Sequence, residues 1–508
     1  MAGRAASIGS VAIRVAFLAA ECEPWAKTGG LADVVDALAR ALGRLDGRPA
    51  GIVDVYLPRY REVAVPRGAS SAQQIRVPDP HSASGVAELS IVDVAADGYR
   101  LRLVDHAAGF DREGIYGNDG EDYGDNPWRF GLLCRATLEA IRLHPEPVDV
   151  LHLHDWHASP ASILCDTRYA DDPVIGRLAV LHTLHNLAYR GWTPRDRLDQ
   201  LGLAPGDGVV PADVESFDLL RAGIERAELV NTVSEGFAAE ALTPEHGRGL
   251  EGLLAGLGDR FFGILNGLDC EVWDPAADPA TAAPYDRADR SGKAACRADL
   301  LAGLGFDPLD AGPVLGMIGR LDPQKGFDLL AAAVPRLLAM GARIVVQGTG
   351  QRELAEPFRR AAAGDPARIA LIERFDRDMA RRIYAGVDLF VMPSRFEPCG
   401  QGQMIALRYG TPPIVRRTGG LADSVVDETD RPGRGTGFCF DEASPEALVA
   451  ACERAIVCRA TGGTAWSRLV DRGMAVDFDW VRGSAPRYLA AYHRAIDLRR
   501  RRLAAGPR

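Results

Sequence analysis

Lysine is so rare in this chain that each position needs an explanation. Of the 59 Lys and Arg residues only Lys27, Lys293 and Lys325 are lysine, which leaves 59 − 3 = 56 arginines. Where arginine is the default cation, a retained lysine indicates a need for a compact ammonium rather than a planar guanidinium. Lys27 precedes Thr-Gly-Gly and Lys325 ends the sequence Gly-Arg-Leu-Asp-Pro-Gln-Lys, so both are candidates for anion binding. Lys293 is interpreted as a surface residue.

The hexapeptide Thr-Gly-Gly-Leu-Ala-Asp occurs twice, at residues 28–33 and 418–423. Each copy follows a cation, Lys27 or Arg417, and precedes a helical pattern. Glycines at the start of a helix let backbone N–H groups approach an anion, and the helix dipole favours negative charge there. We interpret both copies as anion sites. The alternative is a tight turn in which glycine only permits a positive φ.

A second pair of cations lies in the loop 319–326. Arg320 and Lys325 follow a predicted strand and precede a helical pattern that starts at Phe327, so both side chains can reach one diphosphate. Paired cations stabilise the charge that develops on a leaving phosphate as the bond to it breaks. The spacing therefore predicts a diphosphate site.

One carboxylate lies in a dense turn, Pro-Ser-Arg-Phe-Glu-Pro-Cys-Gly at residues 393–400. At such a turn Glu397 can accept hydrogen bonds from sugar hydroxyls, and a helix cap is the alternative role. Asp-x-Asp sequences at 376–378 and 477–479 would suit a metal-dependent nucleotide-sugar transferase. Both precede helical patterns, so we interpret them as N-caps instead.

Histidines alternate in the sequence His-Leu-His-Asp-Trp-His at residues 152–157, and alternate side chains on a strand share a face. Metallohydrolases use the order H-x-H-x-D-H, whereas this order is H-x-H-D-x-H, which disfavours a metal site. We place these residues at the carboxyl end of a strand, where open α/β sheets bind ligands. The same argument covers His185 and Asn186, which follow the next predicted strand.

The composition excludes several classes of protein. A formal charge of −10 argues against general nucleic-acid binding, which needs a basic face. The nine cysteines include no C-x-x-C pair, so we expect reduced thiols and no zinc site. No apolar run reaches the roughly 18 residues that span a bilayer. The N-terminal apolar stretch runs into Glu21, Cys22 and Glu23, so we expect a cytoplasmic protein rather than a secreted one.

Apolar runs alternate with helical patterns along the chain, which is typical of parallel sheets covered by helices on both faces. The first series of predicted strands comprises residues 13–19, 51–57, 148–153, 178–184 and 229–233. The second series comprises residues 314–318, 343–347, 369–372, 389–392 and 413–415. We therefore predict two doubly wound α/β domains, residues 1–265 and 266–485, followed by a C-terminal helical segment, residues 486–508.

Taken in chain order, these motifs resemble the bacterial glycogen synthases and plant starch synthases. The resemblance covers nearly the whole chain and rests on residues 27–34, 154–157, 185–189, 266–269, 319–326, 393–400 and 417–423. It implies an α/β GT-B fold, in which two Rossmann-like domains face each other across an interdomain cleft and the C-terminal helix packs back on the N-terminal domain.

The resemblance implies a hexosyltransferase that moves glucose from ADP-glucose to the non-reducing end of an α-1,4-glucan with retention, releasing ADP. It implies no cofactor and no metal, whereas the net charge and the lack of a long apolar run argue against nucleic acid and membrane as partners. The catalytic residues that it implies are Arg320 and Lys325 at the leaving ADP, Glu397 and His185 at the transferred glucose, and Asp33. The substrate-binding residues that it implies are Lys27, Gly29, Gly30, Tyr116, Asp155, Trp156, Asn186, Asn266, Phe375, Cys399, Gly400, Thr418, Gly419 and Gly420.

The chain departs from the family pattern at a few positions. Gln401 and Gly402 replace the usual Leu and Thr or Ile, Phe375 stands where a tyrosine commonly stacks on adenine, and Ile405 excludes the E-x7-E motif of related transferases.

Use of UDP-glucose and a catalytically weak glucan-binding homologue remain alternatives. A glucan phosphorylase would need a lysine for pyridoxal phosphate, and only Lys293 is unclaimed. The sequence leaves the oligomeric state open.

Overall fold

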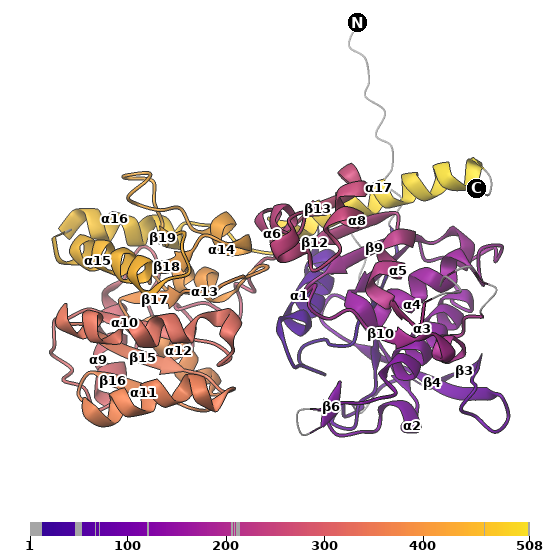
Figure 1. Ribbon diagram of the computed structural model, residues 1–508, viewed down its shortest axis with the longest axis horizontal. Coiled ribbons are helices and arrows are strands. Elements are labelled where there is room, and N and C mark those ends of the chain that lie inside the picture. The colour runs from indigo at the N-terminus through magenta and orange to yellow at the C-terminus, as the bar shows by residue number, and fades with distance from the viewer. Residues whose placement is uncertain are drawn as a thin grey trace, which may run out of the picture. The chain divides into compact units, whose positions relative to one another are not determined.

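The computed structural model describes residues 13–45, 53–66, 68–70, 72–118, 121–204, 207, 209, 214–461 and 463–505. The chain forms two compact units, which Figure 1 shows. Unit 1 contains the chain up to Thr232, residues 241–264 and the C-terminal part from Trp480. Unit 2 contains residues 233–240 and 265–479.

Within the described residues, unit 1 is built on a sheet of nine strands in the order β13-β12-β9-β8-β1-β2-β5-β4-β3. The strands are β1 (Val15–Leu18), β2 (Val53–Pro58), β3 (Gln73–Pro78), β4 (Val86–Ala95), β5 (Arg100–Asp105), β8 (Val150–His154), β9 (Ala179–Leu184), β12 (Leu229–Thr232) and β13 (Phe261–Gly263). Most neighbours are parallel, but β4 runs antiparallel to both β3 and β5. The sheet is therefore mixed at one edge.

The predicted strands of unit 1 are confirmed at β1, β2, β8, β9 and β12. These strands are buried on both faces, and continuous apolar runs are the sequence pattern of such strands. The strands β3, β4, β5 and β13 were not predicted. Exposed and buried positions alternate in β3, so it carries no continuous apolar run.

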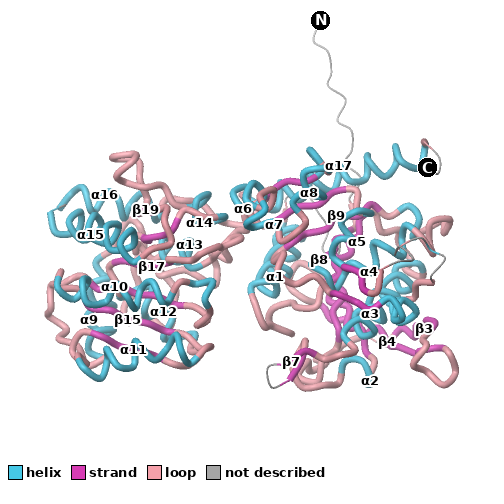
Figure 2. The backbone as a smooth tube through the Cα atoms, in the orientation of Figure 1, coloured by secondary structure: helices cyan, strands magenta, loops and turns pink. Residues whose placement is uncertain are grey.

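Helices cover the sheet of unit 1, as the backbone in Figure 2 shows. The main ones are α1 (Gly30–Arg44), α3 (Asn126–Arg142), α4 (Asp155–Asp166), α5 (Leu219–Arg226) and α17 (Ser484–Ala504). Shorter elements are α2 (Ala107–Phe110), β6 (Gly117–Asn118), β7 (Glu121–Asp122), β10 (Trp192–Pro194), β11 (Ser216–Asp218), α7 (Pro244–Gly247) and α8 (Glu251–Gly256). The last helix, α17, packs against α1 and β9, so the chain ends on the unit in which it begins.

Unit 2 contains a fully parallel sheet of six described strands in the order β16-β15-β14-β17-β18-β19. They are β14 (Val314–Ile318), β15 (Arg343–Gln347), β16 (Ile369–Ile372), β17 (Leu389–Met392), β18 (Pro413–Arg416) and β19 (Phe438–Phe440). The first four have the predicted bounds, β18 ends one residue later than predicted, and β19 was not predicted. The helices are α6 (Glu235–Glu240), α9 (Ser291–Gly303), α10 (Phe327–Ala339), α11 (Arg352–Gly364), α12 (Arg377–Gly386), α13 (Gly402–Arg408), α14 (Gly419–Ser424), α15 (Pro445–Thr461) and α16 (Gly463–Met474).

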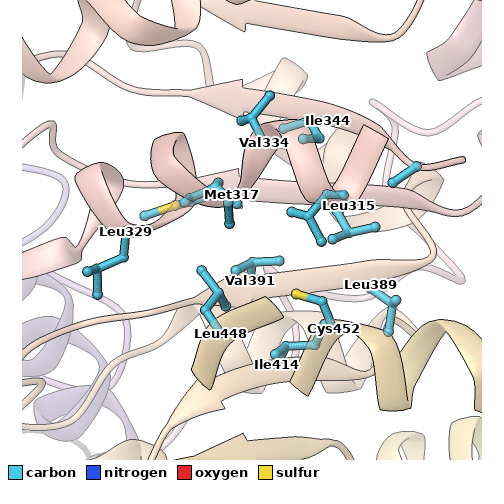
Figure 3. Close-up of a cluster of buried hydrophobic side chains, with 14 of the residues drawn as sticks. Leu315, Met317, Leu329, Val334, Ile344, Leu389, Val391, Ile414, Leu448 and Cys452 are labelled. Carbon is cyan, nitrogen blue, oxygen red and sulfur yellow. The ribbon is translucent and has the colours of Figure 1, made fainter. Parts of the chain in front are cut away.

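The core of unit 2 lies between the strands and the helices that cover them. Figure 3 shows Leu315 of β14 and Val391 of β17 in one cluster with Leu329 of α10 and Leu448 of α15. Each of these side chains is at most 5% exposed. Burying a side chain of this size contributes about 1.5 to 3 kcal/mol, so the cluster fixes the strands whose ends carry the predicted motifs. In the described part of the chain, no helix is long and apolar enough to cross a membrane.

The two Asp-x-Asp sequences differ in their role. Asp376 is the N-cap of α12 and its carboxylate accepts a hydrogen bond from the backbone N–H of Met379 at 2.9 Å, which confirms the prediction. The prediction for the second sequence is wrong. Asp477 accepts a hydrogen bond from the N–H of Asp479 inside a turn, and α17 begins only after Gly483.

Lys293 is half-buried and its ammonium is bound by three groups of the protein, so its interpretation as an ordinary surface residue is wrong. Its Nζ donates to the carbonyl oxygens of Ala385 at 3.0 Å and Tyr409 at 2.9 Å and to Thr411 Oγ1 at 2.7 Å. Burial lowers the pKa of the ammonium to about 8. The cause is tertiary packing, because α9, which carries Lys293, lies against α12. The lysine therefore ties three segments of unit 2 together.

Replacing Lys293 with methionine should lower the free energy of unfolding by about 1 to 2 kcal/mol. Three buried acceptors lose a donor, and relief from burying the charge offsets only part of that loss. Urea denaturation followed by circular dichroism measures the effect. A urea midpoint equal to that of the parent protein would contradict this structural role.

Candidate active site

The predicted motifs of unit 2 lie where the strand order of its sheet reverses. From β14 the chain continues through β15 and β16 on one side, and β17, β18 and β19 lie on the other side. Open parallel sheets bind ligands at such a switch point, beyond the carboxyl ends of the strands. The loops that leave these ends after β14 and β17 are residues 319–326 and 393–400. Both predicted motifs therefore meet at one place.

These two loops fit closely against each other. Gly326 has a φ of +72°, and a Cβ atom on it would lie 2.2 Å from the carbonyl oxygen of Pro393. Only glycine tolerates both conditions. The N–H of Arg395 donates to the carbonyl oxygen of Gln324 at 2.7 Å, and Gln324 Nε2 donates to the carbonyl oxygen of Phe396 at 3.1 Å. Few atoms in this pair of loops can move independently.

Lys325 and Glu397 form an ion pair across the loops. Lys325 Nζ lies 2.6 Å from Glu397 Oε2, which also accepts a hydrogen bond from Ser394 Oγ at 3.0 Å. Glu397 is 5% exposed, whereas the Lys325 side chain is 22% exposed. An ammonium has three N–H donors, so two stay available to a ligand. The carboxylate holds the ammonium in place without consuming its binding capacity.

Arg320 supplies a second cation in the same loop as Lys325. Its side chain is exposed and makes neither a hydrogen bond nor an ion pair with any described residue. By contrast, the neighbouring loop residue Arg395 is engaged, because its guanidinium binds both carboxylate oxygens of Asp328 at 2.8 and 2.7 Å. The positive charge of Arg320 is therefore available to an anionic ligand.

The second Thr-Gly-Gly copy packs against the loop that carries Glu397. A Cβ atom on Gly419 would lie 2.1 Å from the carbonyl oxygen of Glu397, and one on Gly420 would lie 2.2 Å from that of Cys399. The hydroxyl of Thr418 and the N–H of Gly419 donate to Glu240 Oε1 at 2.9 and 2.8 Å. Close packing accounts for both glycines, and the anion at this helix start is a carboxylate of the protein.

Three further predicted residues of unit 2 differ in exposure. Phe375 is 77% exposed after β16, with the Arg377 guanidinium 6.0 Å from the ring centre, which suits stacking of a planar base. Asn266 and Cys399 are buried. Burial raises the pKa of the Cys399 thiol to about 12, and hydrogen bonds from Asn266 oppose that rise only in part. Cys399 is therefore a protonated, unreactive thiol.

The departure at Gly402 has a packing reason. A Cβ atom there would lie 3.0 Å from the Phe390 ring and 3.2 Å from the Tyr384 hydroxyl. The usual larger residue would force these aromatic side chains to move. Gly400, with a φ of +73°, still makes the turn that leads into α13.

Unit 1 repeats this arrangement around β1 and β8. The chain leaves β1 toward β2 on one side, and β8 with β9 lies on the other side. The carboxyl ends of β1, β8 and β9 are neighbours in register. Glu21 follows β1, Asp155 follows β8 and His185 follows β9, so three polar side chains gather at this switch point.

Glu21 binds the backbone of the first Thr-Gly-Gly copy, a role that the sequence motifs do not predict. Its Oε2 accepts hydrogen bonds from the N–H groups of Thr28 at 2.6 Å and Gly29 at 2.8 Å, and its Oε1 accepts one from the Tyr116 hydroxyl at 2.6 Å. The carboxylate is 4% exposed. Its position just after the first buried strand was the available signal, because polar residues there face the ligand edge of the sheet.

The first glycine pair differs from the second in having room above it. A Cβ atom on Gly29 or Gly30 would meet nothing within 4 Å, and the backbone of Gly29 is extended, with a φ of −142°. Neither packing nor backbone conformation requires glycine here, so the space above the turn suits close approach of a ligand. Lys27 Nζ lies 2.5 Å from Asp33 Oδ1 and 3.3 Å from Glu23 Oε2. Two predicted residues, Lys27 and Asp33, thus contact each other.

Asp155 positions the loop that carries His185 and Asn186. Its Oδ1 accepts hydrogen bonds from their backbone N–H groups at 2.7 and 3.4 Å. Asp155 has a φ of +56°, a left-handed conformation at the junction of β8 and α4 that Asp and Asn adopt more readily than most residues. Next to it, Trp156 lies under Gly191, where a Cβ atom would come within 2.3 Å of the indole ring.

Asp155 should make the stability of unit 1 depend on pH. Burial raises the pKa of its carboxyl to about 7, against an ordinary value of 3.8. Below about pH 4 both states are protonated, between pH 4 and 7 only the folded state holds the proton, and above pH 7 the folded state bears a buried charge. The folded parent protein pays free energy either to keep the proton or to bury the charge. The Asp155→Asn protein has no carboxyl to titrate and avoids this cost, and its amide oxygen still accepts the two hydrogen bonds. From pH 5 to pH 8 the unfolding free energy of Asp155→Asn should therefore rise by about 2 to 3 kcal/mol relative to that of the parent protein.

Thermal or urea denaturation of both proteins across this range measures the effect of the Asp155 titration. The substitution keeps the side-chain shape and suits the left-handed backbone, so any constant offset between the curves reports packing. Curves that stay parallel from pH 5 to pH 8 would contradict a carboxyl that titrates near neutrality.

Four histidines lie at the same edge of the sheet of unit 1. His152, His154 and His182 are fully buried, and the His185 ring hydrogen-bonds to His154. Burial lowers the pKa of His182 to about 4 and that of His185 to about 3, and it lowers those of the other two well below 6.5, so all four are neutral imidazoles at pH 7. Within the residues that the structure describes, no cluster of three His, Cys, Asp or Glu residues could hold a metal ion.

Comparisons with known proteins place these features in a family. Residues 14–256 match the family model described as the starch synthase catalytic domain. Residues 312–457 match the model for glycosyl transferases group 1. The two matches fall on the two series of strands, one in each unit.

Relatives match almost end to end. Glycogen synthase from Syntrophotalea carbinolica is 40% identical over 96% of this chain and 99% of its own length. Glycogen synthase from Anaeromyxobacter dehalogenans strain 2CP-C is 43% identical over 94% of this chain and 99% of its own length. Among solved structures, the catalytic domain of starch synthase IV from Arabidopsis thaliana, bound to ADP and acarbose, has a TM-score of 0.86 at 31% identity and covers 96% of this chain and 100% of that one.

Proposed function

Because this chain belongs to the glycogen synthase and starch synthase family, we propose that it is a retaining glucosyltransferase that elongates an α-1,4-glucan from ADP-glucose. One observation carries the proposal: at the switch point of unit 2, Lys325 is held by the buried Glu397 and Arg320 is left without a partner among the described residues. Such a pair of cations suits a leaving diphosphate. The relative from Arabidopsis thaliana was solved with ADP, which supports the adenine nucleotide.

The proposed reaction breaks the bond between the glucose anomeric carbon and the phosphate oxygen. The electron pair of that bond stays with the phosphate oxygen, and Arg320 and Lys325 stabilise the developing negative charge. The 4-hydroxyl of the glucan then forms the new bond to the anomeric carbon, and its proton passes to the leaving phosphate oxygen on the same face. The protein thus supplies charge and orientation, and it needs no covalent nucleophile.

Residues of unit 1 would orient the sugar and the diphosphate. We assign His185 and Asn186 to the transferred glucose, since Asp155 holds their backbone in place. Asp33 serves the glucosyl unit, and Lys27 with the open turn at Gly30 serves the diphosphate. Tyr116 and Trp156 belong to the acceptor side in this proposal.

In unit 2 we assign Glu397, with the N–H groups of Cys399 and Gly400, to the hydroxyls of the transferred glucose. Phe375 would stack on the adenine, and its exposed ring supports that role. Asn266 lies beside Cys399. The residues Thr418, Gly419 and Gly420 would act through the loop against which they pack.

We further propose that the protein works in the cytoplasm and without a metal. All nine cysteines are free thiols, which suits a reducing compartment. The phosphate charge that a metal would otherwise neutralise is assigned here to Arg320 and Lys325.

Comparing donors tests this proposal. Purified protein with a glycogen primer receives ADP-glucose or UDP-glucose in the presence of EDTA, and incorporation of labelled glucose is followed. The proposal predicts a kcat/KM for ADP-glucose at least tenfold above that for UDP-glucose and no loss of rate with EDTA. A preference for UDP-glucose would refute the donor assignment, and loss of activity restored by a divalent metal would refute the metal-free reaction. Binding of glucan without transfer from either donor would indicate a catalytically weak homologue.

A further inference from the structure

A hydrogen bond from the buried His154 reaches the His185 ring from inside unit 1. His154 Nδ1 lies 3.0 Å from His185 Nε2, and the His154 ring packs against that of His152, with ring centres 4.2 Å apart and the planes tilted by 34°. His152 and His154 are completely buried, whereas His185 is partly exposed. Neither His152 nor His154 has a role in the reaction proposed above. Their rings therefore need a different explanation.

The protonation of His152 follows from its partners. The Thr183 hydroxyl donates to Asn231 Oδ1 at 2.7 Å, so its oxygen must accept from His152 Nε2, which lies 2.6 Å away. His152 therefore carries its proton on Nε2. Its Nδ1 accepts from the Tyr492 hydroxyl of α17 at 2.9 Å. This ring is held in one orientation from two sides.

The proton of His154 can be placed by the same reasoning. Its Nε2 is buried and has no hydrogen-bond partner among the described residues. A buried N–H group without an acceptor is rarer and costlier than a buried lone pair without a donor. A neutral imidazole has one N–H, so the proton of His154 belongs on Nδ1, where it is donated to His185 Nε2.

We propose that His154 is a positioning residue that fixes His185 as an imidazole protonated on Nδ1. With Nε2 occupied as an acceptor, the remaining ring nitrogen of His185 can only donate. His185 would then offer an N–H to a sugar oxygen and could not take a proton from a hydroxyl there. That the donated hydrogen bond serves a sugar rests on the proposed function, whereas the tautomer does not.

Nuclear magnetic resonance tests the tautomer directly. Long-range ¹H–¹⁵N correlation spectra of the full chain labelled with ¹⁵N-histidine distinguish the two neutral tautomers, and the signals missing from the His185→Gln protein identify His185. The proposal predicts the Nδ1–H form in the parent protein and a shift to the commoner Nε2–H form in His154→Leu. An Nε2–H form of His185 in the parent protein would overturn it.

Kinetics of two variants test the positioning role. In His154→Asn the side-chain amide can still donate near the position of Nδ1, whereas His154→Leu has no donor. We expect kcat to stay within about threefold of the parent in the first and to fall at least thirtyfold in the second, with KM for glucan unchanged in both. Equal kcat values in two variants of equal thermal stability would overturn the role. If the parent protein transfers no glucose from any donor, the proposed function fails, and the spectra alone then decide the tautomer.

Discussion

Replacing Lys325 with alanine should lower kcat for glucosyl transfer at least 100-fold while the protein stays folded. The ammonium lies 2.6 Å from Glu397 and retains N–H donors, which in the proposed reaction bind the leaving diphosphate as its negative charge develops. Removing one preorganised donor from such a position typically costs about 100-fold to 1,000-fold in kcat. Initial rates at saturating donor and glycogen measure the effect.

Two further lysine variants sharpen this test. Lys325→Arg keeps the charge but replaces a compact ammonium with a planar fork, so it should restore only part of the rate. Lys293→Met removes the other lysine of unit 2, whose ammonium binds only groups of the protein, and should leave kcat unchanged. If Lys325→Ala retained the parent kcat with an unaltered thermal midpoint, Lys325 would have no part in stabilising the leaving group.

Replacing Glu397 with glutamine should lower kcat by a similar factor. The carboxylate is 5% exposed and accepts from both Lys325 Nζ and Ser394 Oγ, so its charge holds the ammonium in position. Glutamine keeps the shape but weakens a charge-assisted hydrogen bond to a neutral one. The same substitution also weakens the acceptor that we propose for the sugar hydroxyls at this turn. We therefore expect at least a 100-fold loss in kcat, measured with the same assay.

A matched substitution separates this effect from a general change of charge. Glu356 lies on α11, where its half-exposed carboxylate binds Arg359 at 2.8 Å. Exposed ion pairs contribute little, so Glu356→Gln should leave both kcat and the thermal midpoint nearly unchanged. A Glu397→Gln protein as active as Glu356→Gln would exclude the proposed role of the buried carboxylate.

Local patterns were sufficient to predict most of the parallel sheets. Four strands of unit 2 have the predicted bounds because continuous apolar runs of this length are typical of strands buried on both faces. The antiparallel strand β4 and its neighbour β3 escaped prediction, since alternation of exposed and buried positions leaves no continuous run. Lys293 was misjudged because its burial depends on α12 and on residues more than a hundred positions away in the chain.

In the candidate site, too, local motifs predict some features, whereas others depend on tertiary packing. Motif spacing placed Arg320, Lys325 and Glu397 in loops after strands, and the structure brings Lys325 and Glu397 into contact. The sequence could not reveal that Glu21 accepts hydrogen bonds from the first Thr-Gly-Gly copy or that Glu240 does so for the second, because both contacts depend on tertiary packing. Identical hexapeptides thus have different surroundings, open at Gly30 and closely packed at Gly420.

If this chain transfers glucose to a glucan with retention, the configuration of the product reveals it most directly. Purified protein receives ADP-glucose and a maltooligosaccharide, and ¹H nuclear magnetic resonance follows the anomeric signals from the first turnovers. We expect new α-1,4 linkages at the non-reducing end and one ADP released for each glucose incorporated. Release of free glucose, a β-configured product or no new linkage at all would contradict this expectation.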